Sequence, residues 1–266
     1  MEYLDYNYEK NGMHYKHTVT EAPPCDAFSM HTHNMHELLF FISGDATHII
    51  EDRKYKLKKG DLIIIRPQKY HYIQIDSCAK YERFDILFDP EIHGISALNK
   101  ISGDIEVINL SPDSPGRDIF KRLDMYYSKL NVDDFSQILH LLLNELFYFI
   151  SIDGKNAERT EFSVISPTLS DALKYINENI FTLKSISEVA GKLFISPTYL
   201  FKLFKTELKQ TPKKYICAKR LLAAQTYISN GDMPSTVYEK CGFNDYTSFY
   251  RSYLNFFGYP PSKTTK

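Results

Sequence analysis

The pattern of apolar and polar positions changes twice along the chain. Between residues 28 and 88, short apolar runs rich in Ile, Leu, Phe and Tyr are broken by turn-forming stretches: SGDA (43–46), EDRK (51–54), KKGD (58–61) and RPQK (66–69). Apolar runs that recur roughly every 8–12 residues between such turns are typical of small antiparallel barrels and sandwiches. The pattern therefore predicts that the N-terminal half is built from β-strands.

Helical spacing replaces this pattern after residue 116. Segments 117–130 and 133–151 carry apolar residues at i, i+3, i+4 and i+7, which is the spacing of one face of an α-helix. The second segment is apolar around much of its circumference. One of its sides can pack on the barrel and another on a partner chain, which favours a homodimer over burial within a single chain.

The C-terminal hundred residues form two units of a short helix, a turn and a longer helix. Residues 151–164 before them are polar and weakly periodic, as a linker should be. Ser166 before Pro167 predicts a helix start, and SISE (185–188) is a capping box in which Ser185 and Glu188 cap each other. A second helix begins at Ser196, a long helix spans 213–229, and the second unit comprises helices at 235–241 and 245–256.

Charge separates the same two halves. Residues 1–166 carry 18 Lys and Arg against 26 Asp and Glu, whereas residues 167–266 carry 14 against 7. The halves thus have net charges of −8 and +7. A basic half joined to an acidic one predicts binding of a polyanion by the basic half, with a solvated basic face as the alternative. The four cysteines lack C-x-x-C spacing, which argues against a thiolate zinc site.

The longer helix of each C-terminal unit has an apolar face and an opposite face that carries polar and basic residues. In the first, Leu200, Leu203 and Phe204 point inward, and in the second Phe249 and Tyr253 do. An outward polar face on the second helix is what insertion into the major groove requires. Two such units on one rigid helix could contact successive major-groove segments about 34 Å apart.

These pieces resemble the AraC-type double helix-turn-helix domain in order and spacing. The resemblance covers residues 168–264 and rests on SISEVA, SPTYLFKLFK, TPKKYI, Arg220 with Ala224, and GFNDYTSFYRSYLNFFG. It implies a bacterial transcription regulator with recognition helices at about 197–206 and 245–256. At matching positions it implies base-facing side chains and, at Lys205, a phosphate contact; the DNA-binding candidates are Thr198, Phe201, Lys202, Lys205, Tyr246, Thr247, Tyr250 and Arg251.

The chain departs from the family pattern at several of these positions. Phe194 and Lys209 stand where the family usually has turn glycines or small residues, and Tyr238 replaces a usual alanine. The usual basic pair late in the second recognition helix is Leu254–Asn255 here, so we expect the first unit to dominate affinity. The alternative role for Arg251 is an ion pair with Asp245 or Glu239.

The stretch HTHNMHE (31–37) concentrates histidines ahead of an apolar run. If it forms a strand, His31, His33 and Glu37 share one face, and His71 can join them from a neighbouring strand. Three imidazoles and one carboxylate suit Fe(II), Mn(II), Ni(II) or Zn(II). His36 is out of phase with this face and His48 is isolated in the sequence, so both are expected on the surface.

The same residues resemble the two cupin motifs. His31, His33, Glu37 and Gly44 match the first motif and Gly60 and His71 the second, which is degraded at Arg66, Gln68 and Ile75. The AraC-type sensory domain is itself cupin-like and keeps such residues without being an enzyme. We therefore interpret His31, His33, Glu37 and His71 as lining a ligand pocket, and predict no metal and no cofactor. The alternative is a metal-dependent cupin enzyme, a sugar isomerase or dioxygenase, fused to a DNA-binding domain.

The sequence thus predicts a multidomain α+β protein that is not an enzyme. Residues 1–151 would form a cupin-like ligand-sensing and dimerisation domain, 152–166 a linker, and 167–266 the double helix-turn-helix domain. The resemblance implies an effector-responsive activator of a carbohydrate-related operon, with double-stranded DNA, a small molecule such as a sugar, a second copy of the chain and RNA polymerase as partners. No stretch approaches the roughly 18–20 uncharged apolar residues of a membrane span. We therefore expect no membrane partner and a cytoplasmic, nucleoid-associated protein.

Overall fold

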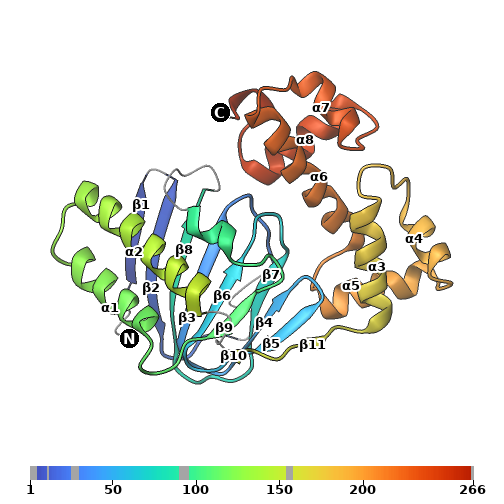
Figure 1. The fold of residues 1–266 in the computed structure, drawn as a ribbon. Helices are drawn as coiled ribbons and strands as arrows, with labels where there is room; N and C mark the ends of the chain where they lie inside the picture. The colour runs from blue at the N-terminus through green and yellow to red at the C-terminus, as the bar shows by residue number, and fades with distance from the viewer. Residues whose placement is uncertain (1–4, 11, 25–29, 90–95, 154–157, 265–266) are drawn as a thin grey trace. The chain divides into compact units, whose positions relative to one another are not determined.

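The computed structural model describes residues 5–10, 12–24, 30–89, 96–153 and 158–264. The chain divides into two compact units, the first made mainly of residues before 164 and the second mainly of residues 164–266. Strands dominate the first and helices the second, as the colours from blue to red show in Figure 1. The predicted α+β class is confirmed.

Two antiparallel sheets form the first unit. The larger has the order β1 (Asp5–Lys10), β2 (Met13–Thr20), β8 (Tyr81–Phe88), β3 (His36–Ser43), β6 (Asp61–Ile65), β9 (Val107–Asn109) and β10 (Glu158–Arg159). The smaller has the order β11 (Ser163–Val164), β5 (Arg53–Lys56), β4 (Ala46–Ile50) and β7 (His71–Ile75). The segment expected to be an irregular linker thus supplies one short strand to each sheet.

Strand register sends alternate side chains of the larger sheet to two different cores. Phe40 lies opposite Phe84, and both pack with helices α1 (Pro115–Tyr127) and α2 (Val132–Asp153) and the 3-10 helix η1 (Ser96–Lys100). Phe41 lies opposite Arg83 and packs instead with residues of both sheets. The face that carries Phe41 is therefore the interior between the sheets, because side chains alternate along a strand.

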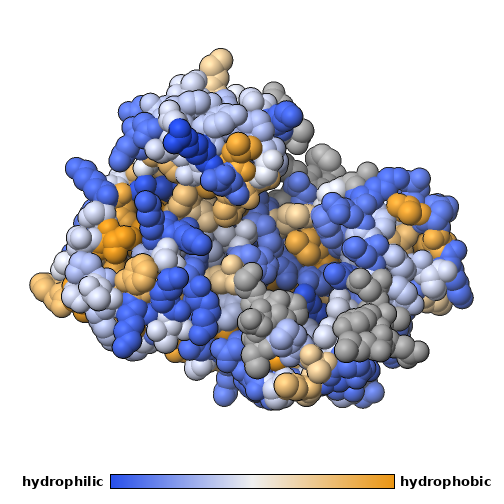
Figure 2. Space-filling view, turned by 180° about the vertical axis from the view of Figure 1, so that it is seen from behind, coloured by the Kyte–Doolittle hydropathy of each residue, from blue (hydrophilic) through white to orange (hydrophobic). Residues whose placement is uncertain are grey.

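Helix α2 is apolar both on the side that packs into the core and on part of the side that faces solvent. Its buried side, which includes Leu139, Leu143 and Phe147, joins the core beneath the larger sheet, whereas Leu141 is 64% and Ile152 77% exposed. By length and composition alone, Val132–Ile152 could cross a membrane, contrary to the expectation from the sequence. This is weak evidence of a span, since the core helix of a soluble protein has the same composition. Figure 2 shows hydrophobic residues in small groups on one face of the molecule.

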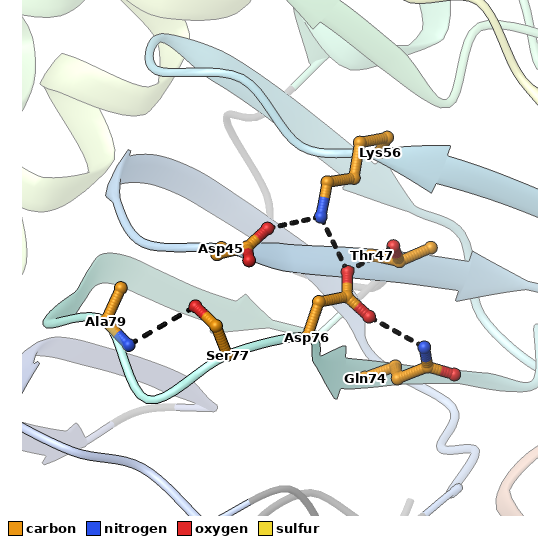
Figure 3. A network of polar contacts seen from close by, with 7 residues as sticks. All are labelled: Asp45, Thr47, Lys56, Gln74, Asp76, Ser77 and Ala79. Carbon is orange, nitrogen blue, oxygen red and sulfur yellow. Dashed lines mark hydrogen bonds and ion pairs between the residues drawn. The ribbon is translucent and has the colours of Figure 1, made fainter.

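A polar network holds the strand ends of the smaller sheet together (Figure 3). Lys56 on β5 pairs with Asp45 and lies 2.8 Å from Asp76, which also accepts hydrogen bonds from Thr47 and Gln74. Burial opposes the charged form of Asp76, but the hydrogen bonds from Lys56, Thr47 and Gln74 lower its pKa. The network ties β4, β5 and β7 together at one end.

Helices form the second unit: α3 (Pro167–Glu178), α4 (Ile186–Lys192), α5 (Pro197–Glu207), α6 (Pro212–Ser229), α7 (Pro234–Lys240), α8 (Tyr246–Phe257) and the 3-10 helix η2 (Pro261–Lys263). The Ser185 and Ser196 side chains accept from backbone N–H groups of the following turn, as expected from caps. Ser166 differs, because its hydroxyl donates to Glu207 instead of capping α3. Glu188 accepts from the Lys184 N–H, one residue before the predicted partner.

Candidate nucleic-acid interface and effector pocket

Helix α5 separates its two faces as the sequence predicts. Leu200, Leu203 and Phe204 are buried, and the four DNA-binding candidates of this helix are exposed: Thr198, Phe201, Lys202 and Lys205. The Lys205 ammonium lies 6.0 Å from the centre of the Phe201 ring, at the outer limit of a cation–π contact. These four side chains present an aromatic ring, a hydroxyl and two ammonium groups to solvent, which can contact base edges and phosphates.

Helix α8 presents the second group of candidates in the same way. Tyr246, Thr247, Tyr250 and Arg251 are all exposed, while Phe249 and Tyr253 are fully buried. Asp245 caps the helix by accepting from the N–H and hydroxyl groups of Ser248. Arg251 makes no ion pair within 4.0 Å with Asp245 or Glu239, three residues that the structure describes. The pKa of Asp245 is lowered mainly by the hydrogen bonds from Ser248 and also by the nearby Arg251 charge.

Tyr238 on α7 has a role that the sequence did not reveal. Its ring packs edge-on against Tyr246, with the ring centres 5.8 Å apart, and also lies near Phe249. An alanine at this position, as is usual in the family, could not make these contacts. Tyr238 therefore supports the first turn of the second recognition helix.

Arg220 joins the two helix-turn-helix motifs. From helix α6, its guanidinium donates to the carbonyls of Ile180 and Leu183 before α4, at 2.8 and 2.7 Å, and to that of Gly242 between α7 and α8, at 2.6 Å. Gly242 has φ +78°, and a Cβ there would lie 2.4 Å from the Phe181 carbonyl oxygen. Only glycine allows the backbone at residue 242 to lie this close to the Phe181 carbonyl. Arg220 and Gly242 together therefore fix the spacing of the two motifs.

Two departures from the family pattern coincide with backbone strain. Phe194 and Lys209 have φ of 56° and 55°, the left-handed region that favours glycine. The sequence therefore identified both positions as turns that a glycine would occupy more easily. Phe194 is also 96% exposed, so burial of its ring does not offset the strain.

The interior of the first unit contains a buried ion pair. Glu37 Oε2 and His71 Nε2 lie 2.9 Å apart, and both side chains are almost fully buried. His71 Nδ1 lies 3.0 Å from the Lys69 carbonyl and must donate to it, since a carbonyl only accepts. Burial disfavours the imidazolium, but the Glu37 carboxylate and the Lys69 carbonyl raise the pKa of His71. Two sequence candidates are thus brought together as a charged pair.

The structure adds three residues to this interior that sequence reasoning missed. Arg83 and Asp85 lie on the inner face of β8, where the guanidinium approaches the carboxylate to 3.3 Å and the Tyr81 hydroxyl to 3.4 Å. Burial and the Glu37 carboxylate raise the pKa of Asp85. His48, expected on the surface, is fully buried with its ring 6.1 Å from that of His71. Burial along β8 and β4 does not follow a period of two, so no local pattern in the sequence indicates these three residues.

His31 and His33 lie close to Glu37 and His71, but not through the strand conformation that the sequence predicted. Strand β3 begins at His36, so residues 31–35 do not alternate as a strand would. Nevertheless, one ligand atom from each of His31, His33, Glu37 and His71 lies within 4.8 Å of the others. The four candidates are brought together, although the reasoning from strand alternation was wrong for the two histidines.

Two family models match different parts of the chain. Residues 189–266 match the model of a helix-turn-helix domain family, and residues 18–80 match that of a cupin domain family. The HTH-type transcriptional activator RhaR of Escherichia coli strain K12 is 24% identical over 263 residues, covering 92% of this chain and 89% of its own.

Solved structures are similar at a lower level. ToxT from Vibrio cholerae O395 is 13% identical, with a TM-score of 0.39 over 96% of this chain and 97% of its own. A transcriptional regulator with an AraC-type DNA-binding domain from Chromobacterium violaceum is 27% identical, with a TM-score of 0.35 over 37% of this chain and 88% of its own.

The order of the two matched domains, the full-length similarity to a transcriptional activator and the paired motifs held by Arg220 agree with one another. The chain therefore combines a cupin domain with a C-terminal helix-turn-helix domain and is homologous along most of its length to a DNA-binding transcriptional activator.

Proposed function

We propose that this regulator is an effector-responsive activator without enzymatic activity, which binds paired DNA segments as a homodimer. The observation that carries the proposal is the exposure of all eight candidate side chains on α5 and α8, in two motifs joined by Arg220. Bound at a promoter in the cytoplasm, within the nucleoid, the protein would assist RNA polymerase. The names of the relatives as transcriptional activators support the sign of regulation.

The chemistry of the first unit's interior supports a polar effector. Arg83 supplies hydrogen-bond donors, Glu37 and Asp85 supply acceptors, and the apolar cluster around them excludes water. A ligand with many hydroxyl groups can donate to the carboxylates and accept from the guanidinium at the same time. A sugar fits this mixture, in agreement with the carbohydrate-related operon that the resemblance implies.

The exposed side of α2 supports a dimer contact. Leu141, Tyr148 and Ile152 are exposed on a helix whose other side is fully packed. Charged substitutions at Leu141 and Ile152 would place two unpaired ammonium groups in the contact. We expect Leu141→Lys/Ile152→Lys to be monomeric by sedimentation where the unchanged protein is dimeric. Identical sedimentation of the two proteins would place the contact elsewhere.

The effector is tested by thermal stabilisation with a panel of monosaccharides. A ligand that binds only the native state raises stability by RT ln(1 + [L]/Kd), which is about 2.7 kcal/mol at a hundredfold excess over Kd. We expect one sugar to raise the melting temperature of the unchanged protein and to leave that of Arg83→Met unaffected. A panel in which no sugar stabilises the protein would contradict a sugar effector but leave DNA binding untouched.

One observation favours the metal-dependent alternative. The three imidazoles and one carboxylate within 4.8 Å of one another form a donor set that suits a divalent iron, manganese, nickel or zinc ion. Both nitrogens of His71 already face oxygen partners, so metal binding there would have to displace a proton and the Glu37 contact. We therefore expect protein purified without chelators to contain well under one metal ion per chain. One ion per chain that is lost in His31→Ala/His33→Ala would instead favour a metal-dependent cupin.

A further inference from the structure

A cleft of about 640 Å³ lies between the two helix-turn-helix motifs of the second unit. One side is formed by the residues that begin α4 and the other by one edge of α8, with α6 between them. Its walls include residues from both motifs: Lys184, Ser185, Lys213, Asp245, Ser248 and Arg251. None of these residues except Arg251 belongs to the expected contacts of the two recognition helices.

The cleft is strongly cationic. Lys184, Lys213 and Arg251 are exposed on its walls, and Arg220 also lines it. Among the lining residues, all of which the structure describes, Asp245 is the one acid, and its carboxylate is engaged in capping α8. The lining therefore carries a net charge of +3, which favours an anionic occupant.

The walls are held in place before any ligand arrives. Arg220 donates to Leu183 and Gly242, which also line the cleft on opposite sides. The Lys184 N–H donates to the Glu188 carboxylate, which fixes the backbone from which the lysine side chain extends. A preorganised set of cations loses less conformational entropy on binding than cations on a mobile loop.

The position of the cleft indicates which anion it takes. When two recognition helices enter successive major-groove segments, the sugar-phosphate backbone between those segments runs past the protein surface between the motifs. We propose that this cleft binds the phosphodiester backbone of that intervening DNA segment, with Lys184 and Lys213 as the contacting cations. The contact fixes the position of the duplex without reading bases, because phosphates carry no sequence information. The inference rests on DNA binding by the two motifs and adds contacts outside the recognition helices.

The first test is the salt dependence of binding of the full chain to a 40-base-pair duplex of fixed arbitrary sequence. Each phosphate contact contributes about 0.9 to the slope of log K against log salt concentration. Lys184→Ala/Lys213→Ala should therefore lower that slope by about 1.8, with an unchanged melting temperature. Lys174→Ala, an exposed lysine on α3 away from the cleft, should leave the slope unchanged. An unchanged slope in the double variant, or an equal loss in Lys174→Ala, would overturn the proposal.

The second test locates the contact on the DNA. A duplex selected by the unchanged protein from a random pool is synthesised with neutral methylphosphonates between the two enriched base blocks. This replacement should weaken binding of the unchanged protein by roughly tenfold and have little effect on the double variant. Equal weakening in both proteins would show that Lys184 and Lys213 do not contact those phosphates. Failure of the unchanged protein to bind any duplex would refute DNA binding itself, which keeps the two failures distinct.

The last test distinguishes binding of a small anion in the cleft from binding of the DNA backbone. Millimolar inorganic phosphate should not raise the melting temperature of the unchanged protein if the cleft is built for a polymer. Stabilisation by phosphate that is lost in Lys184→Ala/Lys213→Ala, together with an unchanged salt slope, would assign the cleft to a small anion and contradict the proposal.

Discussion

The two units of this regulator place their candidate functional side chains in opposite environments. In the first unit, Glu37, His71, Arg83 and Asp85 are enclosed between two sheets and paired with one another. In the second unit, the candidate contacts of α5 and α8 stand on the surface, and the residues that hold the helices are separate from those that face solvent. Under the proposed function, folding and binding therefore share residues in the first unit and use different residues in the second.

The difference has a physical origin in what each unit is proposed to bind. A small molecule must be surrounded to be recognised, so its polar partners are buried and need partners of their own when the ligand is absent. A duplex is contacted on one side only, so the side chains that meet it stay hydrated. Substitution of the buried polar residues of the first unit should accordingly lower its stability, whereas substitution of the exposed candidates on α5 and α8 should lower DNA affinity.

The largest expected effect is that of Glu37→Ala. It removes the carboxylate 2.9 Å from His71 and leaves a buried imidazole without its ionic partner, which should cost about 3–5 kcal/mol. Hydrogen exchange should accelerate in β3 and β7 and stay unchanged in α6. Glu161→Ala, an exposed control, should change neither. Unchanged exchange in β3 would mean that the buried pair does not stabilise the sheets.

Arg220→Ala should be the most damaging change in the second unit. It leaves three backbone carbonyls, those of Ile180, Leu183 and Gly242, without their guanidinium donor, at a cost of about 3 kcal/mol. Arg220→Lys should recover part of this loss, because an ammonium cannot span all three carbonyls. Urea unfolding followed by helix circular dichroism measures both. Equal midpoints for the three proteins would show that the motifs are held together by packing alone.

Lys202→Ala tests the expectation for the second unit, namely a loss of DNA binding without a loss of stability. Binding to a selected duplex should weaken by about 1–3 kcal/mol, with the melting temperature unchanged, since the side chain is exposed. Arg251→Ala should have the smaller effect, because Leu254–Asn255 stand where further phosphate-binding cations are expected in α8. Fluorescence anisotropy of a labelled duplex compares the two. A larger loss for Arg251→Ala would reverse the assignment of the dominant motif.

Asp76→Asn should have the smallest effect and one that depends on pH. Because the pKa of Asp76 is lowered in the folded protein, its contribution is present above the unfolded pKa of about 3.9 and is lost as pH falls through the folded pKa. The variant should be less stable by about 1 kcal/mol at pH 7 and indistinguishable below the lowered pKa. A difference that persists in acid would show that the carboxylate charge is not what stabilises the network of Figure 3.

The helical unit could be predicted almost completely from the sequence. Apolar spacing and caps such as Ser196 determine helix faces locally, so the exposed and buried sides of α5 and α8 agree with the structure. The strained turns at Phe194 and Lys209 could also be predicted, because the chain turns there through a residue with left-handed backbone dihedral angles.

The interior of the first unit could be predicted only in part. Glu37 and His71 were found because a motif marks them, whereas Arg83, Asp85 and His48 lie on strands whose inner face depends on register with distant strands. Charged residues in such strands resemble surface positions until the pairing is known. Likewise, the role of Arg220 depends on carbonyls that lie 22 to 40 residues away in the sequence.

The most direct test of the central claim is selection of DNA by the full chain from a random duplex pool, repeated with Lys202→Ala. If α5 and α8 both read bases, two blocks of enriched bases should appear about 10 base pairs apart, centre to centre, as expected for helices in successive major grooves. Lys202→Ala should weaken or alter one block and leave the other intact. Enrichment of no sequence, or of two blocks that Lys202→Ala leaves unchanged, would contradict recognition of DNA by α5 and α8.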